Sequence, residues 1–164
     1  MEFVGRWYGS GSPLRFEIEG DRVGGVDRVE LPAEEQAGLP WIAPGLIDMH
    51  AHLCFYNGLT YFRDGYDAMT VGAYIHHAAL DYLQQGFTTA RSAGCNDLGI
   101  AKAINNGILP GPRILPAGGF LSQTGGHADL GSWSDRPLEQ DALERAETMY
   151  IVDGVTEARR AVRA

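Results

Sequence analysis

Beyond residue 40, strand-like and helix-like segments alternate along the chain, and this alternation limits the possible folds more than any other feature of the sequence. The run "WIAPGLIDMHAH" over residues 41–52 has the pattern of a buried strand, and residues 70–86 follow it with apolar side chains at helical spacing. A strand at "FTTARSA", a helix over residues 96–107 and a strand at "RILPAGG" continue the series. Strands that alternate with helices predict parallel βαβ units with right-handed crossovers. The expected fold class is therefore α/β.

The length of the chain limits how much of such a fold it can build. About 120 residues follow the first forty, whereas a closed (β/α)8 barrel typically needs about 250. The expectation is a partial barrel of about three βα units, or else a small open α/β sheet. In residues 1–40, apolar Leu14, Phe16 and Ile18 alternate with charged side chains, which predicts a small β-meander. The expected domains are residues 1–40 and residues 41–164.

Polar residues and periodicity indicate where the helices begin. Thr70 is expected to cap the first helix, and Asn96 or Asp97 the second. A further helix is expected over residues 138–150, and a last one, opened by Asp153 or Thr156, over residues 157–164.

Composition and charge exclude several classes of protein. Hydrophobic residues make up 45% of the chain and charged residues 21%, which is typical of a soluble globular protein. The net charge of −8 argues against nucleic acid or an anionic membrane surface as a partner. No stretch approaches the ~20 apolar residues of a membrane span, and the N-terminus lacks a basic region followed by an apolar core. Cys54 and Cys95 are too few for a disulfide framework, although a single bridge stays open, so we expect a cytoplasmic protein.

Two histidines stand one residue apart at the end of the first of these strands. Because a strand alternates its side chains between two faces, His50 and His52 should project to the same side, about 6 to 7 Å apart along the chain. The ends of parallel strands carry the ligand and catalytic groups of α/β folds. We therefore predict that both imidazoles bind one metal ion. Catalytic zinc usually takes three protein ligands plus water, so the pair alone leaves the site incomplete.

The alternation also assigns the neighbours of the two histidines to faces of the strand. Asp48 is expected on their face, where it either accepts a hydrogen bond from an imidazole or makes a structural hydrogen bond at the strand. The other face would carry the apolar side chains of Ile47, Met49 and Ala51, and a layer of helices would cover them.

Further candidate residues lie at the ends of the later strands. His127, in the loop "GGFLSQTGGHAD", is predicted to bind substrate or shuttle a proton, the alternative being a solvated histidine or a partner for Asp129. Arg91, beside Ser92, is predicted to contact a substrate carboxylate, unless it is a buried arginine bonded to backbone carbonyls. Cys54 is expected to be a structural, partly buried thiol rather than a thiolate ligand.

Three segments together resemble one known family. "APGLIDMHAHL" resembles the first barrel strand of the metal-dependent amidohydrolase superfamily, "GFTTARSAG" its second strand and "GPRILPAGGFLSQTGGHAD" its third. In combination they are most similar to the prolidase-like and imidazolonepropionase-like branch. Residues 1–40 resemble, in shortened form, the small β-domain that precedes the barrel. At Ser92 relatives commonly carry an aspartate, so this sequence departs from the family pattern there.

The resemblance implies a (β/α)8 barrel that holds one or two divalent ions, usually zinc, and hydrolyses amide or related C–N bonds with water that the metal activates. It makes His50 and His52 first-strand metal ligands. The family's lysine on the fourth strand, histidines on the fifth and sixth, and aspartate on the eighth have no counterpart in this sequence. The expectation is the N-terminal part of a hydrolase that acts on a small amide, a dipeptide or a cyclic amide, that is inactive alone, and that can form a homo-oligomer.

Two other functions stay open at this point. The chain could be a non-catalytic half-barrel module that pairs with a partner chain. It could also be a self-contained α/β metal-binding protein, in which His127 or Cys54 would supply the third ligand.

Overall fold

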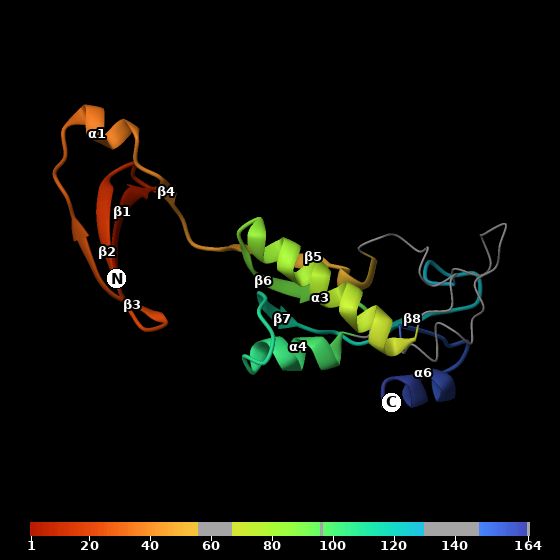
Figure 1. Ribbon diagram of the computed structural model, residues 1–164. Coiled ribbons are helices and arrows are strands. Elements are labelled where there is room, and N and C mark those ends of the chain that lie inside the picture. Colours follow the sequence, from red (N-terminus) through yellow and green to blue (C-terminus); the bar gives the residue numbers. More distant parts are fainter. Residues whose placement is uncertain (56–66, 96, 130–147, 164) are drawn as a thin grey trace. The chain divides into compact units, whose positions relative to one another are not determined.

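The computed structural model describes residues 1–55, 67–95, 97–129 and 148–163 of the chain (Figure 1). The chain divides into two compact units, Met1–Pro44 and Gly45–Ala164. Over the described ranges, no helix combines the length and the apolar character that crossing a membrane requires.

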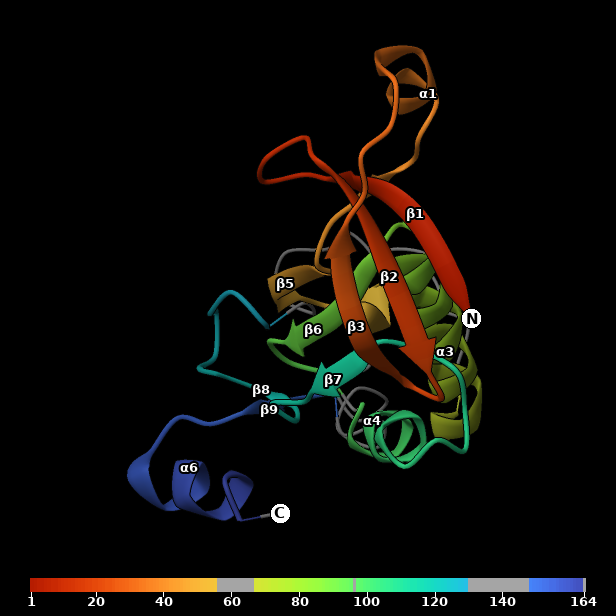
Figure 2. The same cartoon turned by 90° about the vertical axis from the view of Figure 1, so that its left-hand side faces the viewer.

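The N-terminal unit is a four-stranded sheet in the order β3-β2-β1-β4. Its elements are β1 (Glu2–Trp7), β2 (Pro13–Glu19), β3 (Arg22–Arg28), α1 (Ala33–Ala37) and β4 (Trp41–Ile42). Figure 2 shows the antiparallel strands β1, β2 and β3 side by side. Phe16 of β2 is buried, and its ring stacks on that of Phe3 with 5.3 Å between the centroids. The predicted meander is confirmed, and the apolar face of β2 supplies its small core.

The strand expected over residues 41–52 is broken, because its first two residues belong to the N-terminal sheet. Trp41 and Ile42 form β4, which runs parallel to β1, and the guanidinium of Arg6 lies 4.1 Å over the ring of Trp41. Pairing starts again only at Leu46, after Pro44, which has no N–H to donate to a ladder. The apolar run therefore contributes one short strand to each unit.

The second unit is built on a three-stranded parallel sheet in the order β5-β6-β7. Its strands and the two helices between them are β5 (Leu46–Ala51), α3 (Ala68–Gln84), β6 (Phe87–Ser92), α4 (Leu98–Asn105) and β7 (Arg113–Leu115). Figure 1 shows α3 and α4 alongside this sheet, and Ile75 and Ile104 from the helices share one core with Ala90 and Ile114 from the strands. The predicted βαβ units are confirmed. The opposite face of the sheet is open and carries Arg113 and Leu115.

Asp67, and not Thr70, caps α3. The carboxylate of Asp67 accepts hydrogen bonds from the backbone N–H of Thr70 at 2.9 Å and from its hydroxyl at 3.0 Å. Thr70 is thus a donor inside the first turn, and the prediction placed the helix start too late. Asp97, one of the two expected residues, occupies the N-cap position of α4, but its side chain makes no capping hydrogen bond to the described helix. Gly86 ends the α3 segment with a φ of +89°, a conformation that side chains rarely adopt.

A separate two-stranded parallel sheet and a last helix complete the described chain. They are β8 (Phe120–Ser122), β9 (Met149–Ile151) and α6 (Val155–Ala161). The helix expected over residues 138–150 lies mostly outside the described residues, and its last part is wrong, because Met149 and Tyr150 pair with β8. Pairing with a neighbouring strand here outweighs the helical pattern of the local sequence. The last helix is confirmed, but its N-cap is Gly154 and not Asp153 or Thr156, so it begins at Val155.

Candidate active site

The two histidines lie side by side at the end of β5. His50 is exposed within the strand and His52 follows it, with 5.0 Å between the ring centroids and 85° between the ring planes. The ring of His52 also lies 5.8 Å from that of Phe55 and 5.3 Å from that of Phe120. The imidazole of His50 is therefore exposed, whereas that of His52 lies beside two aromatic rings.

A cavity of about 460 Å³ has both histidines in its wall. Its lining residues are His50, His52, Phe55, Ala93, Phe120, His127, Ala128 and Met149. The structure thus brings His127 from the loop after β8 to the same cavity as the histidine pair. Arg91 and Asp48 are not among the lining residues.

The chemistry of the pair fits a divalent metal ion. Nδ1 of His52 is buried and has no hydrogen-bond partner among the residues that the structure describes. A buried ring nitrogen without a partner is costly unless another group binds it, and imidazole nitrogen is a common ligand of zinc. Within the described ranges, no group of three or more His, Cys, Asp or Glu side chains is placed to hold a metal ion. His50 and His52 accordingly offer two of the ligands that such an ion needs.

A bulge in β5 places Asp48 on the helix-covered face, which corrects the prediction that it shares a face with the histidines. The pairing of β5 with β6 shifts register between Asp48 and Ala51, and one extra residue reverses the alternation beyond it. Asp48 pairs with Ala90, and its carboxylate accepts a hydrogen bond from the hydroxyl of Tyr82 on α3 at 2.9 Å. Its other oxygen accepts the backbone N–H of His50 at 2.9 Å. Asp48 therefore makes structural hydrogen bonds and orients the backbone, not the ring, of His50.

Burial and the contact with Asp48 together determine the protonation state of Tyr82. Burial, followed by the hydrogen bond and the charge of Asp48, raises the pKa of Tyr82 to about 12. The phenol consequently keeps its proton and stays the donor at neutral pH.

The same bulge explains why Ile47 and Met49 are not covered by helices as expected. They are 59% and 61% exposed, whereas Ala51 beyond the bulge is buried as predicted. Ile47 pairs with Thr89, on the open face of the sheet. An apolar strip thus borders the histidine pair on the side away from the helices.

Arg91 and Ser92 lie on opposite faces of β6. Ser92 is fully buried on the helix side, near Asp97. Arg91 pairs with Leu115 on the open face, and its buried Nη1 finds no hydrogen-bond partner in the described part of the chain. A guanidinium nitrogen of this kind suits a carboxylate. Its role in substrate binding stays a prediction.

Two glycines shape the loop that carries His127. Gly125 has a φ of +71°, and a Cβ at Gly126 would collide with the hydroxyl oxygen of Ser122. The chain can therefore turn tightly between β8 and His127, which brings the imidazole to the cavity wall.

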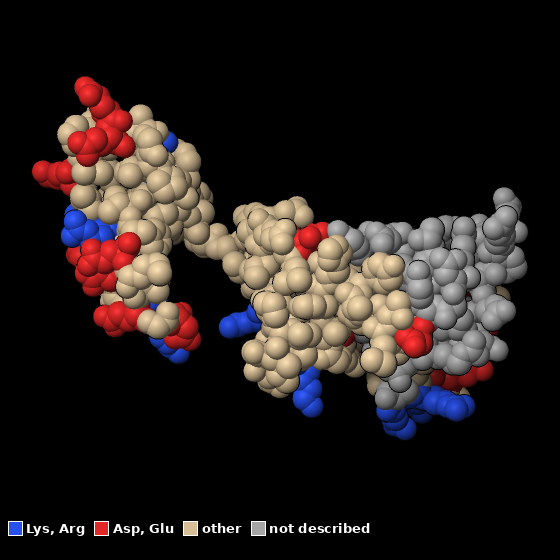
Figure 3. All heavy atoms as spheres, viewed as in Figure 1, with Lys and Arg blue, Asp and Glu red and all other residues tan. Residues whose placement is uncertain are grey.

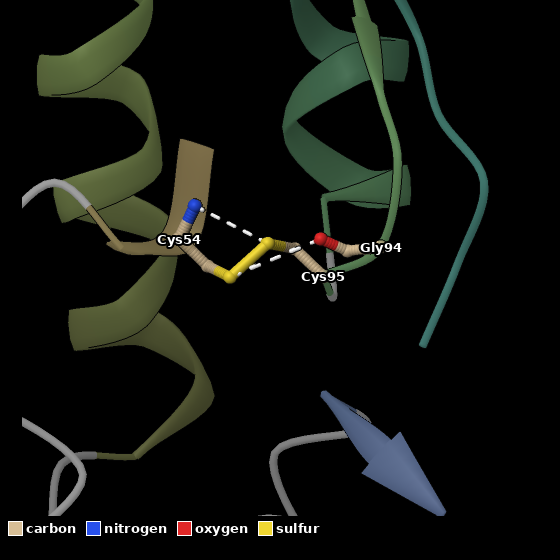
Figure 4. Close-up of a disulfide and its surroundings, with 3 residues drawn as sticks. All are labelled: Cys54, Gly94 and Cys95. Carbon is tan, nitrogen blue, oxygen red and sulfur yellow. Dashed lines mark hydrogen bonds between the residues drawn. A yellow bond between two sulfur atoms is a disulfide. The ribbon is translucent and has the colours of Figure 1, made fainter. Parts of the chain in front are cut away.

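Cys54 and Cys95 form a disulfide that joins the chain just beyond β5 to the chain just beyond β6 (Figure 4). Both residues are fully buried, and the backbone N–H of Cys54 donates to Sγ of Cys95 at 3.3 Å. Sγ of Cys54 lies 4.0 Å from the carbonyl oxygen of Gly94. The expected free thiol is thus wrong, the single bridge that the sequence left open is formed, and Cys54 is not available as a third metal ligand. The bridge holds η1 (Leu53–Phe55) in place directly after His52.

Sequence reasoning missed the aromatic and apolar walls of the cavity. Phe55 lies three residues beyond His52 in the sequence, and this short separation could have predicted that its ring lies near the histidines. Phe120 begins the glycine-rich segment before His127, but nothing in the sequence indicates that its ring reaches the first strand. Met149 fell in the segment expected to be helical, and only its pairing with β8 brings it to the cavity.

A sequence profile described as the amidohydrolase family matches residues 41–164, which include both histidines and every residue that lines the cavity. The chain belongs to the amidohydrolase family. The ochratoxinase of Aspergillus niger is 36% identical over 141 residues, a match that covers 76% of this chain and 28% of that protein.

Solved amidohydrolase structures share the fold. A prolidase crystallised with N-methylphosphonate-L-proline superposes with a TM-score of 0.68 at 28% identity, over 99% of this chain and 43% of that one. The A. niger ochratoxinase superposes with a TM-score of 0.66 at 26% identity and the same coverage, 99% and 43%. The chain therefore spans less than half of these relatives. The likeness confirms the expected fold class, a partial (β/α)8 barrel preceded by a small β-strand unit.

Proposed function

We propose that this amidohydrolase chain contributes a divalent-metal site, with zinc as the expected ion, to the hydrolysis of C–N bonds in a small amide, a dipeptide or a cyclic amide. The observation that carries the proposal is the histidine pair at the end of β5, in which His52 has a buried ring nitrogen without a hydrogen-bond partner among the described residues. His127 shares the cavity with this pair.

His50 and His52 would hold the ion. When bound, such an ion lowers the pKa of a water molecule towards neutrality and polarises the carbonyl group under attack. The chain's own residues supply the surroundings. The rings of Phe55 and Phe120 stack with 5.8 Å between centroids and limit the access of water to His52, which strengthens electrostatic interactions there.

His127 and Arg91 would bind the substrate. The imidazole of His127 lies in the cavity wall, where it can donate a hydrogen bond to a substrate oxygen or move a proton at a ring nitrogen. Arg91 carries a buried Nη1 without a partner in the described ranges, on the open face of the sheet. The proline in the ligand of the related prolidase structure has a carboxylate that an arginine could pair with. This supports a substrate with a carboxylate beside the C–N bond.

The described residues supply only two metal ligands, so we expect no turnover from these 164 residues alone. Metal binding is therefore the property of this chain that tests the proposal. Isothermal titration of the purified chain with zinc should show saturable binding that the double variant His50→Ala/His52→Ala loses.

His77→Ala is the matched control, because His77 is an exposed histidine on α3, away from the cavity. It should bind zinc as the unchanged chain does. The assignment of the ligands would be refuted if the double variant bound zinc as the unchanged chain does, or if the His77 variant lost zinc binding.

A further inference from the structure

The loop that carries His127 is shaped by its own hydrogen bonds. The backbone N–H of Gly125 donates to Oδ2 of Asp129 at 2.8 Å, and that of Ala128 donates to Oγ of Ser122 at 3.2 Å. These bonds fix the turn on both sides of His127. They link the loop only to itself, so they do not set its position relative to the cavity.

Asp153, which follows β9, ties this loop to a different segment of the chain. Its Oδ1 accepts the backbone N–H of Thr124 at 2.8 Å, and its Oδ2 accepts the hydroxyl of Thr124 at 2.6 Å. The backbone N–H of Val152 donates to the carbonyl of Ser122 at 2.7 Å. Asp153 is itself held, because its N–H donates to Oε2 of Glu157 on α6 at 2.8 Å. One carboxylate thus uses both oxygens to hold the residue that begins the His127 turn.

We propose that Asp153 is a positioning residue that fixes His127 at the cavity through its paired hydrogen bonds to Thr124. The inference rests on the proposed function of the cavity, since it concerns the residue there that would bind substrate. The loop needs such a fastening because Gly125 and Gly126 give its backbone unusual freedom, and a group that acts on a substrate must be held within a small range of positions.

The protonation state of Asp153 agrees with this role. The hydrogen bonds from the side chain and the backbone of Thr124 lower the pKa of Asp153 below its ordinary value. The carboxylate is therefore ionised at neutral pH, and both of its bonds to Thr124 are charge-assisted, which makes them stronger than bonds between neutral groups.

Nuclear magnetic resonance of the full chain, labelled in its histidine rings, tests the proposal without any need for turnover. The His127 signals are assigned by their loss in His127→Gln. In the unchanged chain, the ring of His127 should show a single set of chemical shifts. It should also show nuclear Overhauser effects to the other residues of the cavity wall, which report its contacts with them. In Asp153→Ala these contacts should disappear, and the amide of Thr124 should exchange with solvent roughly tenfold to a hundredfold faster.

Two further variants separate positioning from a general loss of stability. Asp153→Asn keeps one acceptor and adds a donor for the Thr124 hydroxyl, so it should restore the His127 contacts. Asp67→Ala removes the same pair of bonds, from an aspartate to the N–H and hydroxyl of a threonine, at the start of α3. It should lower stability and leave the His127 signals unchanged.

Unchanged His127 contacts in folded Asp153→Ala would overturn the proposal, and so would an equal loss in Asp67→Ala. If Asp153→Ala does not fold, Thr124→Val decides, because it removes only the hydroxyl bond and should weaken the His127 contacts partially. The spectra are recorded without metal and again with zinc. If zinc leaves the signals of His50 and His52 unchanged, the proposed function fails, while the metal-free spectra still decide the role of Asp153.

Discussion

At the scale of single residues, one extra residue in β5 decides which side chains meet in the cavity. Strict alternation predicts that His50 and His52 lie together, and they do. It also predicts that Asp48 joins them, and this fails because the bulge lies between Asp48 and Ala51. No residue type in "LIDMHA" marks a bulge, so the sequence alone does not reveal the change of face.

The carboxyl of Asp97 makes stability depend on pH. Asp97 is fully buried, and burial raises its pKa, an effect that the nearby hydroxyl of Ser92 offsets only in part. Because this pKa is higher in the folded chain than in the unfolded chain, the folded chain binds the proton more tightly. The stability that the protonated carboxyl contributes is therefore complete at pH values below the unfolded-state pKa, and it is lost as the pH rises through the folded-state pKa. Asp97→Asn should therefore be more stable than the unchanged chain at pH 7, by on the order of 1 kcal/mol.

Urea denaturation of both proteins at several pH values measures this difference, which should shrink towards zero at acidic pH. Asp21→Asn serves as the control, because the side chain of Asp21 is 92% exposed and its replacement should change stability little at any pH. A stability difference for Asp97→Asn that is the same at every pH would contradict the account.

At the scale of elements, the sequence predicts a helix or strand best where a single hydrophobic periodicity continues between residues that mark its two ends. β6 lies where its pattern places it, because the strand is bounded by Gly86, and α3 does so beyond its first turn, because the helix buries one stripe. Residues 41–52 read as one strand because they form one apolar run, yet Pro44 divides it between two sheets. The strand at Met149 depends on a partner far away in sequence, which no local pattern contains.

The Cys54–Cys95 disulfide should contribute substantially to the stability of the second unit. It closes a loop with a sequence separation of 41, for which the chain-entropy relation gives about 4 kcal/mol. Thermal denaturation with and without a reductant should show a clear drop in the melting temperature of the unchanged chain. The double variant Cys54→Ser/Cys95→Ser should melt at the lower temperature and be insensitive to the reductant. A melting temperature of the unchanged chain that ignores the reductant would show that the bridge does not form.

The bridge also bears on the compartment. Disulfides that persist are typical of oxidising environments. The cytoplasmic location stays a prediction, and the buried Cys54–Cys95 bridge weighs against it.

At the scale of the whole molecule, the balance of charge argues against nucleic acid as a partner. Figure 3 shows acidic side chains gathered on the visible surface of the N-terminal unit, and the chain as a whole carries a net charge of −8. The arginines of α6, Arg159 and Arg160, form a local basic area with Arg163, too small to reverse this balance.

The open face of the β5-β6-β7 sheet carries the apolar side chains of Ile47, Met49 and Leu115, which are 59%, 61% and 48% exposed. In a (β/α)8 barrel this face meets the other strands across the interior. It also supports the alternative of a half-barrel module that pairs with a partner chain, and homo-oligomerisation stays a prediction. The proposed hydrolase and the half-barrel module differ in whether the histidine pair binds metal.

An anomalous difference map recorded at the zinc edge, from crystals of the chain grown with zinc, shows whether the histidine pair binds the ion. We expect a peak about 2 Å from a ring nitrogen of both His50 and His52, at the wall of the cavity that His127 shares. Zinc density only at other side chains, such as His76 and His77 on α3, would contradict it and leave the half-barrel module as the better account.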